Sequence, residues 1–156
     1  MNFDVSVAPP NHPSVRALVY CALDELNRRY GANADDASLD FDELEPPRGA
    51  FFVARENGQL AGGVALRTIC APDLGIMEIK RLWVRPDLRG RGVARVLMNA
   101  AEEWAQRDGR REIYLETGEK QPEAVALYHA IGYERVAAFP SGVPHYPEGI
   151  KFKKQL

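Results

Sequence analysis

Apolar residues alternate with polar ones in some parts of the chain and recur every three or four positions in others. This change of period separates strands from helices. Residues Phe3–Val7 alternate, which predicts a short opening strand. A helical stripe then predicts a helix over Ser14–Tyr30, which Gly31 ends. Three further strands are predicted at Ala50–Glu56, Gln59–Ile69 and Gly75–Val84.

The segments between these elements carry signals of their own. Asn57 and Gly58 separate the second and third strands, and this dipeptide favours the positive φ values of a tight hairpin turn. The acidic segment Asn33–Pro47 is broken by adjacent prolines, and we expect it either to be mobile or to frame a substrate mouth. Within it, Leu39–Leu44 is predicted to form a short helical turn.

The second half of the chain shows the same change of period. An apolar stripe from Val93 to Trp104 predicts a helix that Gly109 ends. A strand follows at Glu112–Glu116, and Pro122 fits the first position of another helix. The remaining elements are a strand from Tyr133, a loop over Pro140–Gly149 and a strand over Ile150–Lys154. This order predicts an α/β fold in which helices flank a central mixed, mostly antiparallel sheet, with one domain over residues 1–156.

Composition narrows the class of protein. A hydrophobic share of 46% and a charged share of 27% are ordinary for a globular protein, and a net charge of −2 argues against a nucleic-acid partner. The start of the chain lacks the pattern of a signal peptide, and no apolar run is long enough to cross a membrane, so we expect a cytoplasmic protein. The cysteines and histidines are scattered without ligand spacing, which predicts neither a metal site nor a disulfide framework: Cys21, Cys70, His12, His129 and His145.

The strongest chemical signal lies where the strand ending at Val84 leads into the helix that starts near Gly92. Backbone N–H groups at a helix N-terminus lack intrahelical partners and lie at the positive end of the helix dipole. Gly90 and Gly92 carry no Cβ, so an anionic ligand can approach the backbone closely. The turn is therefore a candidate phosphate site, although a lone pair of spaced glycines also occurs in plain connections.

Two familiar phosphate-binding loops do not fit this turn. A P-loop requires Gly-Lys-Ser/Thr, whereas Val93 and Ala94 follow Gly92 here. The dinucleotide fingerprint requires a third glycine, and Arg95 stands at that position. That fingerprint also belongs to repeated strand–helix–strand units, whereas three antiparallel-type strands precede this turn.

The chain resembles the GCN5-related N-acetyltransferase (GNAT) superfamily at several places. Residues Arg89–Ala94 match the family signature Arg/Gln-x-x-Gly-x-Gly/Ala, and the lead-in Glu78–Pro86 is also typical of the family. Farther along, Glu123–Tyr133 resembles its second motif, which ends in Leu-Tyr followed by Gly-Phe/Tyr. The resemblance covers the order of elements along essentially the whole chain. It implies the GNAT-like fold, in which the fourth and fifth strands splay apart.

The resemblance implies acetyl-CoA as cosubstrate and no metal. Backbone amides of the turn would hold the pyrophosphate, and they belong to Arg89, Gly90, Arg91, Gly92, Val93 and Ala94. The backbone of Leu82, Trp83 and Val84 would pair with the pantetheine arm, and the Val84 N–H would polarise the thioester carbonyl. Gln121 occupies a position at which the family often has an asparagine that touches this arm. Arg85, Arg91 and Arg95 are further candidates for phosphate contacts or are solvated.

The resemblance also implies the catalytic groups. Tyr128 stands where family members use a tyrosine to protonate the departing thiolate, although it also fits the helix stripe as a packing residue. Glu78 is the candidate general base, because a carboxylate on an otherwise apolar strand has a raised pKa. A solvated pair between Glu78 and Lys80 is the alternative, and Glu116 competes for the role of base.

These observations predict N-acetyl transfer from acetyl-CoA by direct attack of a primary amine. A small-molecule acceptor is preferred over a protein lysine or N-terminus, because no peptide-docking feature is visible. The alternatives are a non-catalytic coenzyme A-binding or sensing module and a nucleotide-binding protein that uses the same turn. We expect no nucleic-acid or membrane partner, and the resemblance keeps a homodimer among the alternatives.

Overall fold

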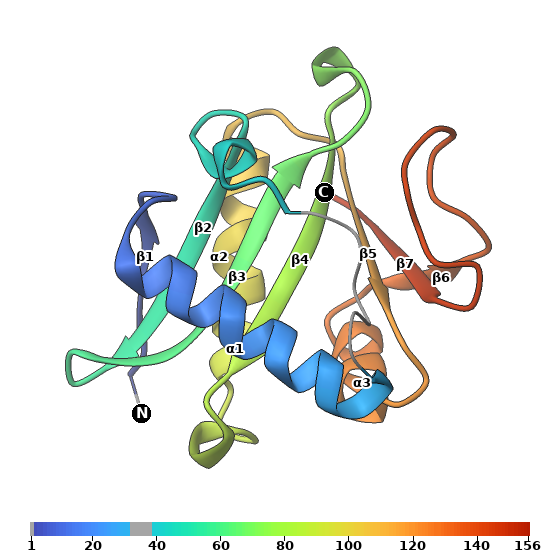
Figure 1. Ribbon diagram of the computed structural model, residues 1–156. Coiled ribbons are helices and arrows are strands. Elements are labelled where there is room, and N and C mark those ends of the chain that lie inside the picture. The colour runs from blue at the N-terminus through green and yellow to red at the C-terminus, as the bar shows by residue number, and fades with distance from the viewer. Residues whose placement is uncertain (1, 32–38) are drawn as a thin grey trace.

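A seven-stranded mixed sheet carries helices on both of its faces (Figure 1). The computed structural model describes residues 2–31 and 39–156. The strands are β1 (Asp4–Ala8), β2 (Gly49–Glu56), β3 (Gln59–Thr68), β4 (Ile76–Val84), β5 (Glu112–Thr117), β6 (Glu134–Val136) and β7 (Ile150–Gln155). The α-helices are α1 (Pro13–Tyr30), α2 (Val93–Arg107) and α3 (Pro122–Ala130). The short 3-10 turns are η1 (Phe41–Leu44), η2 (Pro72–Leu74) and η3 (Pro86–Leu88).

The sheet has the strand order β1-β2-β3-β4-β5-β7-β6, and β4 and β5 are its parallel neighbours. These two strands pair only from Ile76 opposite Glu112 to Glu78 opposite Tyr114. Beyond Glu78 the strands separate, and β5 remains paired with β7 while β4 remains paired with β3. This arrangement confirms the predicted fold class, with its mostly antiparallel sheet and splayed fourth and fifth strands.

A β-bulge bends β4 within the splayed part. Ala65 of β3 lies opposite Lys80, whereas Gly63 lies opposite Trp83, so β4 has one extra residue in this interval. Arg81 has a φ of 56°, which is unusual for a residue other than glycine. A bulge increases local twist and redirects the strand. Here it redirects β4 beyond the point at which the ladder to β5 ends.

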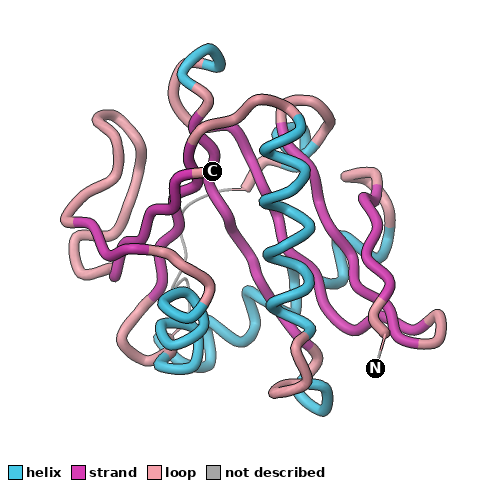
Figure 2. The backbone as a smooth tube through the Cα atoms, turned by 180° about the vertical axis from the view of Figure 1, so that it is seen from behind, coloured by secondary structure: helices cyan, strands magenta, loops and turns pink. Residues whose placement is uncertain are grey.

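Apolar residues fill a separate core on each face of the sheet. Alternation along β2 points Phe51 and Val53 toward α1 and Phe52 toward α2. The core beneath α1 contains Val15, Leu18, Val19, Leu44, Phe51, Val53 and Ala65. The core on the opposite face is larger, and both α2 and α3 pack against it (Figure 2). Methionine and isoleucine at positions 77 and 79 belong to the α2 face, so Glu78 between them faces α1.

Local sequence signals account for most element boundaries. The side chain of His12 accepts a hydrogen bond from the N–H of Ser14 at 3.1 Å and caps α1, which ends before Gly31. Asn57 and Gly58 both have positive φ, which confirms the predicted hairpin. The predicted helical turn is observed as η1, while η2 and η3 are short turns in the connections before and after β4. Residues 33–38 of the predicted mouth segment lie outside the described residues.

Candidate active site

A cavity of about 630 Å3 opens where β4 and β5 separate. From α1 it is lined by Ala22, Glu25, Leu26 and Tyr30, and from β4 by Glu78, Ile79, Lys80, Arg81, Leu82 and Trp83. Further along the chain it is lined by Glu116, Thr117, Gly118, Glu119, Lys120, Gln121, Tyr128, Tyr146, Glu148 and Gly149. Because Glu78 faces α1 and Tyr128 packs in the core beside α2, the cavity is lined from both faces of the sheet.

The structure brings some of the predicted site residues together in this cavity and leaves others beside it. Glu78, Leu82, Trp83, Gln121 and Tyr128 all line the cavity. Val84 is buried at the end of β4 and is not a lining residue, and neither are the turn residues 89–94. The turn follows β4 directly and leads into α2.

The turn has the geometry of an anion site. Gly90 and Gly92 have φ values of 77° and 89°, in the region that glycine adopts without strain. A side chain built on either glycine would meet no atom within 4 Å, so the space next to the backbone is open. The N–H of Val96 is bonded to the carbonyl of Gly92 at 3.1 Å. The amides that precede it in α2 therefore have no intrahelical partner, and an anion can bind them.

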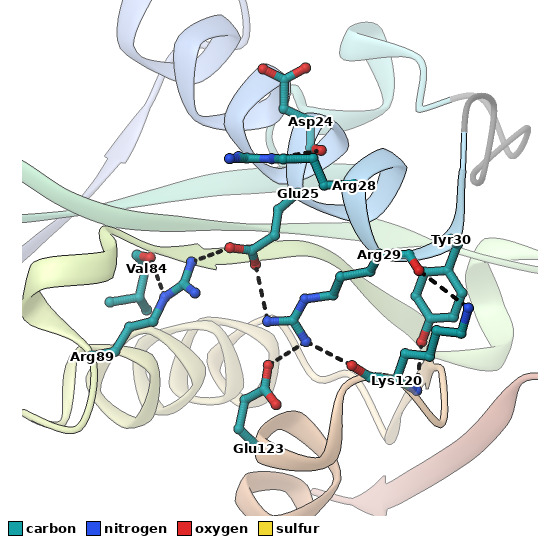
Figure 3. Close-up of polar contacts among 9 residues, drawn as sticks. All are labelled: Asp24, Glu25, Arg28, Arg29, Tyr30, Val84, Arg89, Lys120 and Glu123. Carbon is teal, nitrogen blue, oxygen red and sulfur yellow. Dashed lines mark hydrogen bonds and ion pairs between the residues drawn. The ribbon is translucent and has the colours of Figure 1, made fainter.

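The arginine that opens the signature is held by two elements. Arg89 donates from Nε to the carbonyl oxygen of Val84 at 2.9 Å and from Nη2 to the carboxylate of Glu25 in α1 at 2.6 Å (Figure 3). The same carboxylate lies 3.8 Å from the guanidinium of Arg29. An ion pair thus connects α1 to the turn beside the predicted pyrophosphate site.

The C-terminal end of α1 is also tied to the start of α3. Arg29 forms an ion pair with Glu123 at 2.5 Å and donates to the carbonyl of Lys120 at 2.9 Å (Figure 3). The N–H of Lys120 in turn donates to the hydroxyl of Tyr30 at 3.0 Å. These contacts join α1 to the segment after β5, and Glu25, Tyr30 and Lys120 line the cavity.

Glu78 is a buried carboxylate with a buried partner. Its side chain accepts from Arg67 Nε at 2.9 Å and lies 2.8 Å from Arg67 Nη2, and the residues are 4% and 8% exposed. Burial raises the pKa of Glu78, while the charges of Lys80 and Arg67 oppose that rise. Glu78 is therefore not part of a solvated strand face, which removes the solvated form of the Glu78–Lys80 alternative.

Tyr128 lies at the other side of the cavity, within an aromatic cluster. Its ring centre is 6.0 Å from that of Tyr133 and 5.7 Å from that of Phe152. The residue is 6% exposed, and burial raises the pKa of its phenol, so the hydroxyl stays protonated at neutral pH. Loss of this proton to solvent is disfavoured, so the hydroxyl can still donate it to a stronger base that forms beside it.

Glu116, the competing carboxylate, is committed to the loop between β6 and β7. Both of its oxygens lie 3.1 Å from the backbone N of Tyr146, and Lys151 Nζ is 3.3 Å away. Lys151 is 4% exposed and also donates to the carbonyls of Tyr146 and Gly149. Glu116 thus fixes the position of Tyr146 at the edge of the cavity.

Sequence reasoning missed several of these residues. Arg67 carried a signal, because it is a charged residue within the otherwise apolar strand that pairs with the strand of Glu78. Glu25 and Arg29 are spaced for an ion pair within a helix, but nothing local indicates that Glu25 also reaches Arg89. Lys151 carried no signal that separates it from the neighbouring lysines of β7.

Among the described residues, no group of three or more His, Cys, Asp or Glu side chains is placed to hold a metal ion. None of the helices in residues 2–31 and 39–156 combines the length and the apolar character that a membrane span requires.

The comparisons with known proteins agree on one family. The sequence profile of the Acetyltransferase (GNAT) family matches residues 7–133. The chain is 31% identical to the uncharacterized N-acetyltransferase YjgM of Escherichia coli over 142 residues, which are 81% of this chain and 85% of that protein. It is 32% identical to mouse N-acetyltransferase 8 over 66% of this chain, but it spans only 46% of that longer protein.

Solved structures show the same fold. A GNAT family acetyltransferase from Elizabethkingia anophelis, solved with acetyl-CoA bound, superposes with a TM-score of 0.70 over 99% of both chains at 16% identity. This chain therefore belongs to the GNAT acetyltransferase family, and its class is that of an N-acetyltransferase-type acyltransferase.

Proposed function

We propose that this chain transfers the acetyl group of acetyl-CoA to a primary amine of a small molecule. One observation carries the proposal: a carboxylate and a protonated phenol line the same cavity from opposite faces of a splayed sheet. A base and an acid on either side of a reacting group are what amide formation from a thioester requires. Family membership supports the same reaction class.

The cosubstrate would bind along β4 and the turn. The amides of Arg89, Gly90, Arg91, Gly92, Val93 and Ala94 would hold the pyrophosphate. The pantetheine arm would lie against Leu82, Trp83 and Val84 of β4, beyond the last pair between β4 and β5. Gln121, half-buried at the start of α3, would contact the arm from the other side.

The chemical step would use residues from both faces. Glu78 takes a proton from the acceptor ammonium, and the free amine nitrogen attacks the thioester carbon. The Val84 N–H stabilises the oxyanion of the tetrahedral intermediate. The C–S bond then breaks, Tyr128 protonates the departing coenzyme A thiolate, and the amide is released. The nitrogen loses its second proton to solvent as the amide forms, Tyr128 recovers a proton from solvent, and Glu78 releases its proton before the next turnover.

We propose Glu78 rather than Glu116 as the base because of the contacts that the two carboxylates make. The carboxylate of Glu116 is already occupied by the N–H of Tyr146 and the ammonium of Lys151, which hold it against the loop before β7. The pKa of Glu78 is raised by burial, toward the range in which a carboxylate can accept and release a proton during turnover.

The test is the release of coenzyme A thiol from acetyl-CoA in the presence of small amines, peptides with a free lysine and peptides with a free N-terminus. We expect saturable thiol release with a subset of the small amines, and mass spectrometry should find one added acetyl group per acceptor. Coenzyme A binding without thiol release for any acceptor would favour the non-catalytic alternative. Release with peptides alone would move the acceptor to proteins.

A further inference from the structure

Arg67 lies between two carboxylates that belong to different elements. On one side it holds Glu78 of β4, and on the other its Nη1 lies 3.4 Å from both oxygens of Glu43 in η1. Arg67 is 8% exposed, so the guanidinium is removed from water and these carboxylates compensate its buried charge. Glu43 is itself held in place, because its side chain accepts from the N–H of Asp40 at 3.4 Å and completes the capping box of η1.

The negative charge around Arg67 depends on whether Glu78 carries a proton. While Glu78 is ionised, the guanidinium lies between two carboxylates, and each carboxylate disfavours the negative charge of the other. When Glu78 takes a proton, this repulsion is removed, and Glu43 still faces the guanidinium. Arg67 therefore favours ionised Glu78, whereas Glu43 favours its protonation.

We propose that Arg67 and Glu43 are positioning residues that set the proton affinity of Glu78 in opposite directions, an inference that rests on the proposed role of Glu78 as base. Neither residue lines the cavity, so both act through Glu78. The guanidinium fork of Arg67 also fixes the orientation of the carboxylate, since Nε and Nη2 both lie within 2.9 Å of the same oxygen.

Other charged groups face Glu78 and stay unchanged in the test. Lys80 from β4 lowers the pKa of Glu78, and Glu116 from β5 raises it. From α1, Glu25 and Tyr30 line the same cavity, and Glu25 is paired with Arg89. Because these groups are common to all variants, differences among the variants report on Arg67 and Glu43.

The experiment compares Glu43→Gln, Arg67→Met and Arg67→Lys, with Asp42→Asn as a control that removes an exposed charge from the same turn. Glutamine at position 43 keeps an acceptor for the Asp40 N–H. The first readout is the acidic limb of the pH profile of kcat/KM for the acceptor. The second is the titration of the Glu78 carboxyl carbon by NMR in the free protein with labelled glutamate, assigned with Glu78→Gln.

We expect Glu43→Gln to move both midpoints to lower pH and Arg67→Met to move them to higher pH, the latter by about one unit or more. Arg67→Lys should return most of the shift, Asp42→Asn should leave both midpoints unchanged, and all variants should keep wild-type affinity for coenzyme A. Shifts of the same sign in Glu43→Gln and Arg67→Met, or no shift in either, would overturn the inference.

The design separates this inference from the proposed function. If no amine is acetylated, the proposed function fails, and the NMR titration still decides whether the two residues act on Glu78. If amines are acetylated but the Glu78 midpoint does not move, the inference alone fails. Should Arg67→Met not fold, the downward shift in Glu43→Gln and the near wild-type midpoint of Arg67→Lys remain decisive.

Discussion

Burial has the same electrostatic effect on Glu78 and Tyr128 but suits them to different roles. In both it disfavours the charged form and raises the pKa. For a carboxyl group this brings the pKa closer to neutrality, where a base is useful. For a phenol it makes the proton harder to lose to solvent, so the hydroxyl is available when a thiolate forms beside it. The arginine fork on Glu78 limits how far its pKa rises.

Replacement of Tyr128 by phenylalanine should separate catalysis from packing. The ring and its contacts with Tyr133 and Phe152 are kept, while the proton donor is lost. We expect kcat to fall by about 10²- to 10⁴-fold, the usual worth of a general acid. The dissociation constant for coenzyme A, measured by calorimetry, should stay within about twofold.

Tyr133→Phe is the matched control, because it removes a phenol from the neighbouring ring, which does not line the cavity. Its kcat should stay close to that of the wild type. Equal losses in both variants would mean that the tyrosines support packing, and an unchanged kcat in Tyr128→Phe would remove the assignment of the acid.

At the scale of elements, a glycine lies at each end of α2, but the two glycines have different roles. Gly92 precedes the helix and Gly109 follows it, with φ values of 89° and 74°. A side chain at either position would meet no atom within 4 Å, so both substitutions carry a backbone cost and no clash. Only the N-terminal end presents free amides to an anion.

Gly92→Ala should therefore weaken coenzyme A binding more than tenfold in calorimetry, because a methyl group would stand in the space that the pyrophosphate approaches. Both variants should lower the free energy of unfolding by about 1–2 kcal/mol, but Gly109→Ala should leave coenzyme A binding unchanged. Similar losses of affinity in both variants would show that the effect is one of helix stability rather than of ligand approach.

Loss of the ion pair between α1 and the turn should strengthen coenzyme A binding. Glu25 occupies Arg89 at 2.6 Å, and both side chains are partly exposed. Glu25→Gln should tighten coenzyme A binding by about two- to fivefold at low ionic strength, and the gain should shrink as salt is added. Glu103→Gln, an exposed residue of α2 that pairs with Arg107, is the control with the same change of net charge. Weaker binding in Glu25→Gln would mean that the pair organises the turn instead of competing with the diphosphate.

Elements of this kind could be predicted because their signals are local. The glycine that ends α1, the hairpin at Asn57 and the glycine turn before α2 each depend on a few adjacent residues. The contacts that shape the site join residues far apart in sequence, such as Glu25 with Arg89, and depend on how α1 crosses the sheet. The bulge at Arg81 also could not be predicted, since no glycine or asparagine marks its positive φ.

At the scale of the whole molecule, buried charge gathers where the sheet opens. The ladder between β4 and β5 ends at Glu78, which is buried with Arg67, and Glu116 of β5 is paired with buried Lys151. A closed sheet would satisfy these backbones with hydrogen bonds and fill the space with apolar side chains. The opening instead leaves room for a cavity, and charged pairs hold the separated strands in place. Burying these charges costs desolvation energy, so the site lowers the stability of the folded protein.

This cost should be visible in the pH dependence of unfolding. The pKa of Glu78 is raised above its usual value of 4.5 by burial, so the folded state binds this proton more tightly than the unfolded state does. The contribution to stability is fully present below pH 4.5 and is lost as pH rises through the higher pKa of the folded state. Each unit of pKa difference corresponds to about 1.4 kcal/mol.

Glu78→Gln cannot ionise, so its Tm relative to the wild type should rise from about pH 4.5 upward and then reach a plateau. Calorimetric scans between about pH 4 and 8 measure this difference, and about 1 kcal/mol corresponds to roughly 2–4 °C in a chain of this size. The exposed variant Glu103→Gln should show no such trend. A difference that falls with pH would mean that Arg67 stabilises ionised Glu78 more than burial destabilises it, and a flat difference would mean that the two effects cancel. The carboxylate would then bind its proton too weakly to act as the base at neutral pH.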